Sequence, residues 1–481
     1  MLSQITVSDH YHPFKQKVTM FSNSKYVPKV LKMASGAVLK LQTGRLNDTI
    51  LKTASIYGGQ PKYGELPHEF GVKRLAGTKE DGAMRDWFIG ECKSLGCQVK
   101  VDEIGNIFAL YIGKNRGKPT ATGSHLDTQP EAGKYDGILG ALAGLEVLKT
   151  FKENKYVPNY DFCVAVWFNE EGARFSRSCM GSSVWAKLLP LQEAYKYKSI
   201  NEAKPQSVFD SLKETGYLGT FPASYNENPI DAHFELHIEQ GPILEEEKKK
   251  IGIVTGVQAY LWEKFTIEGV CAHAGTTPWR SRKDALLMAS RFLLAAEDIS
   301  KKNGGLFTCG TMEIEPFSIN VIPNKVSFTL DYRHDSDEIM QKMRSETREV
   351  FDKIILENQA GFMKYTSEFI LSSDAIKFHD SILKCISDAA RIQFKSEEVM
   401  KICSGAGHDS CGTSKRVPTG MIFIPSKDGL SHNYQEYSSP EDVQNGFEVL
   451  LESILNYDTL RLQRGNSYIS VSYTHLTLPT N

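Results

Sequence analysis

The chain has 481 residues, of which 41% are hydrophobic and 24% are charged, the composition of an ordinary globular protein. Its formal net charge of -2 gives no electrostatic basis for binding nucleic acid or an anionic membrane surface, and no apolar run approaches the roughly 20 residues that span a bilayer. The nine cysteines are odd in number and form no C-x-x-C pair, so we expect a reduced, cytoplasmic protein.

Helical spacing and strand alternation divide the first half of the chain into a regular series of elements. Two helices precede a pair of strands near 98–102 and 106–112. A strand at 120–124, an apolar helix at 138–151 and an almost continuously apolar strand at 160–168 come next. A continuous apolar run is typical of a strand buried on both faces, and the strand–helix–strand order predicts an α/β fold with a mostly parallel sheet.

The pattern changes after about residue 257, where the order becomes strand, helix, strand, strand, helix, strand. This order predicts a small domain of the ferredoxin-like type, inserted into the first domain. The predicted units are a mostly parallel-sheet catalytic domain (34–257 and 374–464), an inserted ferredoxin-like α+β dimerisation or lid domain (258–373), an extension (1–33) and a non-native tail (465–481). The tail is excluded because it has neither helix caps nor charged residues.

Histidine and carboxylate side chains gather at the predicted ends of three strands and on one glycine-flanked loop. The four clusters are His125/Asp127/Asp136, Glu170/Glu171, His237/Glu239/Gln240 and the loop residue His408. Because the carboxyl ends of parallel strands converge on one crevice, these clusters are expected to meet. Imidazole and carboxylate ligands together suit zinc, and a carboxylate can bridge two ions, so the clusters predict a two-metal site.

The adjacent carboxylates Glu170 and Glu171 have separable roles. Neighbouring residues at the end of a strand point in opposite directions, so one can bind metal while the other faces water and acts as a general base. The roles of two further histidines stay open. His233 lies on the same strand face as His237 and is its rival as a ligand, and His432 is equally compatible with a place near the site and with a structural role in its loop.

Six motifs follow one another in a fixed order along the chain. They are Gly123–Thr128 (GSHLDT), Tyr135–Gly140 (YDGILG), Phe168–Phe175 (FNEEGARF), Leu236–Pro242 (LHIEQGP), Ala272–Pro278 (AHAGTTP) and Ser404–Asp409 (SGAGHD). This set resembles the M20-type dinuclear zinc amidohydrolases, in the branch of the N-carbamoyl amino acid hydrolases and allantoate amidohydrolases. Any one motif would be a weak signal, whereas six in order, over most of the chain, are a strong one.

The resemblance implies two zinc ions per subunit. One zinc would be held by His125, Asp136 and His237. The other would be held by Asp136, Glu171 and His408, so that Asp136 bridges the two ions. These ligand sets match the clusters of histidine and carboxylate found at the strand ends.

The resemblance also assigns catalytic and substrate-binding roles. Glu170 would be the general base, and Asp127 would orient His125. The residues expected to bind the substrate are Gln240, His273, Asn320 and Arg333. A planar guanidinium such as that of Arg333 can hold a substrate carboxylate through two hydrogen bonds. Members of the family form homodimers through the inserted domain, so some of these contacts could cross the subunit interface.

Within the family, the resemblance points to hydrolysis of N-carbamoyl-β-alanine to β-alanine, ammonia and carbon dioxide, the β-ureidopropionase reaction of pyrimidine degradation. The alternatives with the same catalytic core are an N-carbamoyl-L-α-amino acid hydrolase and an allantoate amidohydrolase. One methylene group, worth only about 1–3 kcal/mol in a pocket, separates the α and β substrates. A metal-free binding protein on a decayed enzyme fold is the rival from another class, but it predicts lost ligands, and every expected position is filled.

Overall fold

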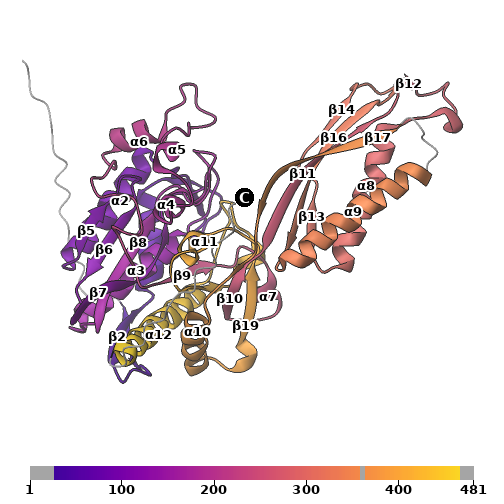
Figure 1. The fold of residues 1–481 in the computed structure, drawn as a ribbon. Helices are drawn as coiled ribbons and strands as arrows, with labels where there is room; N and C mark the ends of the chain where they lie inside the picture. Colours follow the sequence, from indigo (N-terminus) through magenta and orange to yellow (C-terminus); the bar gives the residue numbers. More distant parts are fainter. Residues whose placement is uncertain (1–25, 358–362, 466–481) are drawn as a thin grey trace, which may run out of the picture.

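The computed structural model describes residues 26–357 and 363–465, which form two main sheets with separate hydrophobic cores (Figure 1). The central sheet has the spatial order β18 (Ile376–Lys377), β10 (Ile251–Val257), β20 (Thr419–Ile424), β9 (Ala232–Ile238), β7 (Asn115–His125), β8 (Tyr160–Trp167), β6 (Ile107–Tyr111) and β5 (Gln98–Val101), with β19 (Val399–Ser404) beside β10. β20, β9, β7 and β8 run parallel, β6 pairs antiparallel with β8, and β5 pairs antiparallel with β6 at the edge. The predicted α/β fold with a largely parallel central sheet is confirmed.

Helices cover both faces of the central sheet. The longer ones are α1 (Arg45–Ile56), α2 (Lys79–Ser94), α3 (Ile138–Glu153), α6 (Val208–Thr215), α10 (Asp380–Gln393) and α12 (Pro440–Gly465), and the shorter ones are α4 (Met180–Trp185), α5 (Leu191–Ala194), α7 (Ile243–Glu246) and α11 (Asp409–Ser414). α3 lies so close to the sheet that a Cβ on Gly144 would be 2.5 Å from Val164 Cγ1. On the opposite face, the rings of Trp185 in α4 and Trp167 in β8 lie 5.3 Å apart. Val164 and Trp167 are three residues apart in β8, so their side chains point to opposite faces of the sheet, and α3 and α4 cover opposite faces.

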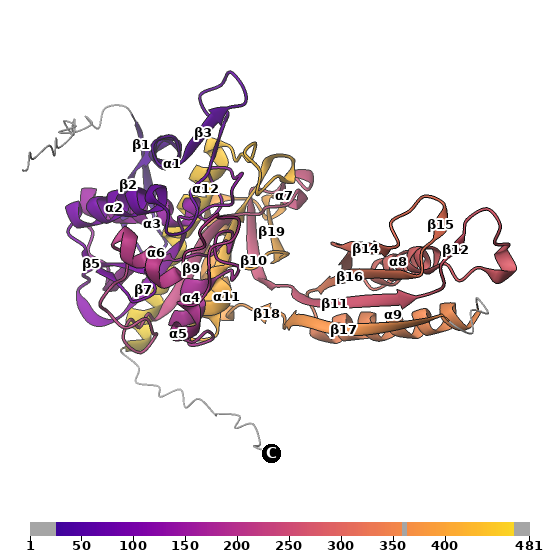
Figure 2. The same cartoon turned by 90° about the horizontal axis from the view of Figure 1, so that it is seen from above.

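The second sheet projects from the first as an arm (Figures 1 and 2). Its antiparallel strands are β13 (Leu306–Thr308), β14 (Met312–Glu315), β16 (Lys325–His334), β11 (Ala259–Glu268) and β17 (Lys364–Ser373), and its helices are α8 (Ala285–Lys302) and α9 (Asp337–Glu357). The order β13–β16–β11–β17 is that of the predicted ferredoxin-like arrangement. The second strand of the expected order is divided into β13 and β14, because one extra residue interrupts the pairing with β16 between Thr308 and Met312. The predicted domain boundaries stay predictions.

Several short elements were not expected from the sequence. The hairpins β1 (Val27–Lys32) with β2 (Val38–Thr43) and β3 (Gly59–Lys62) with β4 (Phe70–Val72) pack beside the central sheet, β12 (Ala272–His273) pairs with β15 (Val321–Ile322), and single helical turns lie at η2 (Trp279–Ser281), η3 (Ser396–Glu398) and η4 (Lys427–Gly429). Most of the expected extension and the tail from residue 466 onward lie outside the described residues. In the part of the chain that is described, no helix has the length and apolar character needed to cross a membrane.

Candidate metal centre and active site

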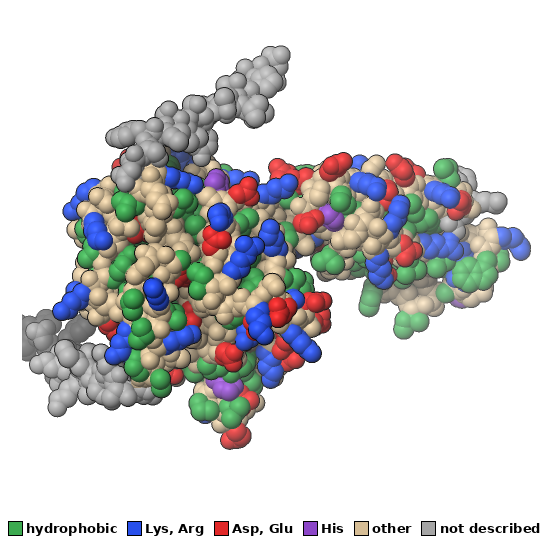
Figure 3. All heavy atoms as spheres, turned by 90° about the horizontal axis from the view of Figure 1, so that it is seen from below, with side chains coloured by type: hydrophobic (Ala, Val, Ile, Leu, Met, Phe, Trp, Pro, Cys, Tyr) green, Lys and Arg blue, Asp and Glu red, His purple; other side chains and the backbone are tan. Residues whose placement is uncertain are grey.

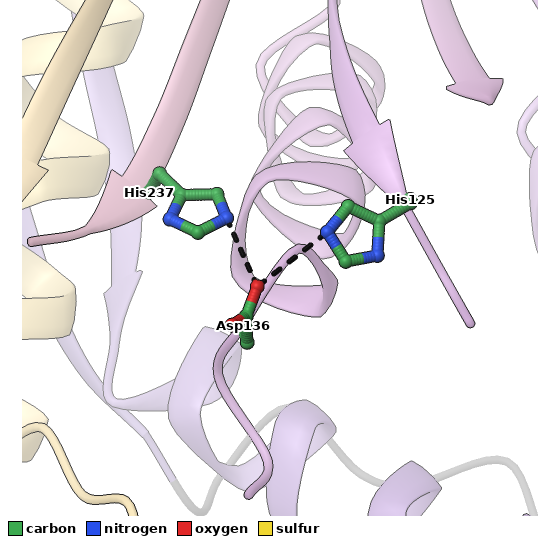
Figure 4. A group of neighbouring side chains, drawn as sticks. All are labelled: His125, Asp136 and His237. Carbon is green, nitrogen blue, oxygen red and sulfur yellow. Dashed lines mark ion pairs between the residues drawn. The ribbon is translucent and has the colours of Figure 1, made fainter. Parts of the chain in front are cut away.

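Two histidines from neighbouring parallel strands point at one carboxylate (Figure 4). His125 is the last residue of β7, and His237 is the penultimate residue of β9. Asp136 lies in the turn before α3, with its Oδ1 3.5 Å from His125 Nε2 and 3.2 Å from His237 Nε2. All three side chains are buried. Gly137 makes this approach possible, because a Cβ there would lie 2.2 Å from the His125 ring, and its φ of 67° favours glycine.

The other oxygen of Asp136 belongs to a second group of possible ligands. His432 Nε2 lies 3.4 Å from Asp136 Oδ2 and 3.2 Å from Glu171 Oε2. Asp136 therefore stands between the pair His125 and His237 on one side and the pair Glu171 and His432 on the other. This is the position that a carboxylate bridging two metal ions would occupy.

His408, the expected partner of Asp136 and Glu171, does not share a group of ligand atoms with them. It groups instead with Glu235 and His237, and its ring centre lies 4.7 Å from that of His237. The Nε2 atom of His408 lies 2.9 Å from Ser404 Oγ, within hydrogen-bonding distance. Burial, and to a smaller degree the nearby His237, lowers the pKa of His408 to about 3.

His432 is the candidate ligand that the sequence reasoning left undecided. It lies in the loop after β20, and β20 is the direct parallel neighbour of β9. Once the pairing of β20 with β9 is known, the rule that parallel strand ends converge applies to this loop as well and places His432 at the site. β19, which precedes His408, is separated from β9 in the sheet by two strands, β10 and β20.

Glu170 and Asp127 lie beside the first ligand group. Glu170 Oε2 is 3.5 Å from His125 Nε2, and Cys179 Sγ donates to Glu170 Oε1 at 3.2 Å. The Asp127 carboxylate accepts hydrogen bonds from the backbone N–H groups of Glu170 and Glu171, each at 3.3 Å. Asp127 also contacts His125 Nδ1, through its backbone carbonyl oxygen at 2.9 Å and more distantly through its carboxylate Oδ1 at 3.9 Å. Asp127 thus orients both the His125 ring and the segment that carries Glu170 and Glu171.

The environment shifts the pKa values of Glu170 and Asp136 in opposite directions. Burial raises the pKa of Glu170 well above its ordinary value, and the carboxylates of Asp409 and Glu171 raise it further. Burial would also raise the pKa of Asp136, but hydrogen bonds with three histidines hold it well below its usual range. Buried imidazoles that share a carboxylate form the donor set that zinc and related divalent metals prefer, so the residues fit such an ion.

The expected substrate-binding residues lie in two different places. Gln240 is at the metal groups, where its Nε2 donates to Asp136 Oδ2 at 2.7 Å. Arg333 Nη1 donates to the backbone oxygen of Gly405, on the loop before His408, at 2.8 Å. His273 and Asn320 adjoin each other at the free end of the arm, where Ala274 N donates to Asn320 O at 2.9 Å (Figure 2). A single chain therefore does not bring the four residues together.

Comparisons with known proteins identify the family and the fold. The model of the peptidase family M20/M25/M40 matches residues 121–456. The N-carbamoyl-L-amino-acid amidohydrolase of Rhizobium meliloti is 35% identical over 425 residues, covering 88% of this chain and 98% of that protein. The allantoate amidohydrolase of Bacillus subtilis is 33% identical, covering 79% and 92% of the two chains. The crystal structure of an amidase of the hydantoinase/carbamoylase family from Burkholderia multivorans is 36% identical and superposes with a TM-score of 0.80, covering 87% and 98% of the two chains.

Proposed function

Because the chain belongs to the peptidase family M20/M25/M40, we propose that it is a metal-dependent amidohydrolase that cleaves N-carbamoyl amino acids. The observation that carries the proposal is the position of Asp136 between two groups of possible ligands, of which His125 and His237 are buried. Hydrolysis of the carbamoyl group would release the amino acid, ammonia and carbon dioxide. The activities of the two relatives described above, on N-carbamoyl-L-amino acids and on allantoate, support this class of linear ureido substrate.

Two zinc ions per subunit fit the ligands. His125, Asp136 and His237 would hold one ion, and Asp136, Glu171 and His432 would hold the other. Bound there, the metal would supply Lewis-acid polarisation of the carbamoyl oxygen and would lower the pKa of water. This assignment exchanges His408 for His432 in the second ligand set.

Glu170 is the proposed general base. It lies beside the first ligand group without being part of it, 3.5 Å from His125 Nε2. Its elevated pKa, caused by burial and neighbouring carboxylates, suits a group that accepts a proton from water and passes it to the leaving nitrogen. Cys179 Sγ, which donates to the Glu170 carboxylate, and the Asp127 carboxylate, which accepts from the Glu170 backbone N–H, fix the position of Glu170.

A homodimer would supply the substrate contacts that one chain leaves apart. His273 Nδ1 accepts hydrogen bonds from the backbone N–H groups of Gly275 and Thr276, at 3.0 and 3.2 Å, so its Nε2 is the protonated nitrogen and can donate to a substrate. The same end of the arm exposes hydrophobic side chains that a second copy could cover, as Figure 3 shows. The exposed side chains are Trp279, Phe317 and Ile319.

The substrate backbone is the remaining choice. Two of the relatives are N-carbamoyl-L-amino acid amidohydrolases, so we take N-carbamoyl-L-α-amino acids as the first candidate substrates. N-carbamoyl-β-alanine is the second candidate, favoured by the detailed resemblance of the six sequence motifs. Both substrates carry a carboxylate that Arg333 could hold through two hydrogen bonds.

The test is release of ammonia by the purified, zinc-loaded protein from N-carbamoyl-L-α-amino acids, N-carbamoyl-β-alanine and allantoate. Faster turnover of the α substrates supports the first candidate, and faster turnover of N-carbamoyl-β-alanine replaces it with the second. Preference for allantoate would contradict both. Protein that binds no zinc and releases no ammonia from any of the three would overturn the proposal as a whole.

A further inference from the structure

The loop that carries His432 is closed on itself. Lys427 N donates to Tyr437 O at 2.9 Å, and Ser438 Oγ donates to Pro425 O at 2.7 Å, so both ends of the loop meet at the end of β20. His432 itself has a φ of 53°, in the left-handed region that residues other than glycine rarely adopt. A strained backbone of this kind persists only where surrounding contacts fix it. The contacts that fix His432 therefore matter for the second ligand group.

Glu436, in the same loop, makes the contact that joins it to Asp136. Its Oε1 accepts hydrogen bonds from the backbone N–H groups of Tyr135 at 2.9 Å and of Asp136 at 3.1 Å. The side chain is fully buried and packs so tightly that a Cβ on Gly133 would lie 2.2 Å from Glu436 Cβ. One carboxylate thus connects two loops that are about 300 residues apart in sequence.

Ser431 completes the connection. Its hydroxyl lies within hydrogen-bonding distance of two carboxylates, 2.9 Å from Asp136 Oδ2 and 3.1 Å from Glu436 Oε2. Asp136 is therefore held at its backbone by Glu436 and at its side chain by Ser431, and both come from the loop that presents His432. The relative position of Asp136 and His432 depends on this small network.

A second buried carboxylate shows what a purely structural role looks like in this chain. Asp102 is also fully buried, and its Oδ1 accepts hydrogen bonds from two backbone N–H groups, those of Ile104 at 3.1 Å and Asn106 at 2.8 Å. Its partners lie two and four residues away, so it stabilises one local turn. Glu436 makes the same kind of hydrogen bonds, but to the segment that carries the shared carboxylate of both ligand groups.

We propose that Glu436 is a positioning residue that fixes His432 against Asp136 and so builds the second metal subsite. The inference rests on the proposed function, because it assumes that the two ligand groups bind metal. Glu436 needs no contact with the metal for this role. It acts through the backbone of Asp136 and through the conformation of its own loop. Outer residues of this kind typically change metal affinity by about 10- to 100-fold.

The experiment is a calorimetric titration of the full-length, metal-stripped protein with zinc alone. Wild type should bind two ions. Glu436→Ala should bind one ion with wild-type affinity and the other about 10- to 100-fold more weakly. Glu436→Gln keeps an acceptor oxygen for both N–H groups and should restore most of the affinity. Asp102→Ala, the matched control, should lower stability while leaving both zinc affinities unchanged.

Ser431→Ala is the second variant, which is needed if Glu436→Ala does not fold. It removes only the hydroxyl and should weaken the same single site to a smaller degree. The inference is overturned if the folded variants keep both wild-type affinities, or if they weaken both sites equally. Wild-type protein that binds fewer than two zinc ions would instead contradict the proposed metal centre, so the two failures can be told apart.

Discussion

The carboxyl edge of the central sheet and the free end of the arm contrast in almost every physical property. At the sheet edge, side chains from several segments approach one another within a few ångströms, as Asp136 does with the buried His237 and the half-exposed His432. At the free end of the arm, His273 and Asn320 are exposed, with exposed apolar side chains nearby. The first region is assembled within one chain, whereas the second presents apolar side chains to solvent. We infer that the chemistry is built within a subunit and that substrate binding is completed between subunits.

The largest effect is expected at the general base. Glu170→Gln keeps the shape of the side chain but cannot accept a proton, so kcat should fall about 100- to 10,000-fold while zinc content is unchanged. Steady-state ammonia release and metal analysis of the same samples measure both quantities. Glu239→Gln is the control, because Glu239 caps Ile243 and Leu244 at the same sheet edge and should retain activity. Near-normal turnover by Glu170→Gln would remove Glu170 from the mechanism.

Replacing each of the two candidate histidines with alanine tests which one completes the second ligand set. His432→Ala should weaken one zinc site by more than about 100-fold, because it removes a ligand rather than an outer contact. His408→Ala should retain two bound ions, since His408 lies apart from the group of Asp136 and Glu171. Zinc titration of both variants decides between them. Loss of one ion in His408→Ala, with two retained in His432→Ala, would restore the ligand set implied by the sequence motifs.

Mixing two inactive variants tests whether the arm completes the site of a second copy. Glu170→Gln and His273→Ala, unfolded and refolded together, should recover about a quarter of wild-type activity, because half the dimers are mixed and each contains one intact site. Glu170→Gln mixed with His432→Ala should recover nothing, since both defects lie within one centre. No recovery in the first mixture would place His273 in the site of its own chain or outside the reaction.

The smallest effect on folding is expected at the exposed end of the arm. Phe317→Ser and Trp279→Ser should change the free energy of unfolding by no more than about 0.5 kcal/mol, because both side chains are mostly exposed. The same substitutions should shift the protein towards the monomer in analytical ultracentrifugation. Leu188→Ser, an exposed apolar residue on the central-sheet side, should leave the oligomeric state unchanged. An unchanged state in all three variants would separate this surface from any dimer interface.

The sequence predicted the fold where local patterns are strong. The apolar run of β8 and the apolar helix α3 were placed almost to the residue, because their burial follows directly from composition. The hairpins β1–β2 and β3–β4 were missed, since their strands are only three to six residues long and give a weak periodic signal. β10 and β19 were also missed, although they form one side of the central sheet.

The site was predictable in part for the same reason. His125, Asp136 and His237 lie next to strands whose parallel order follows from the sequence, so their convergence could be predicted. The choice between His408 and His432 depends on the order of strands at the other side of the sheet. That order is set by the pairing of β20 with β9, a long-range contact that leaves no local pattern in the sequence.

The most direct test of this account is a crystal structure of the zinc-loaded protein with anomalous diffraction at the zinc edge. We expect two zinc peaks per subunit on either side of Asp136, one contacted by His125 and His237 and the other by Glu171 and His432. We also expect the arm of a second copy to bring its exposed end towards the pair. A single peak, or a second peak bound by His408 and not by His432, would contradict the proposed metal centre.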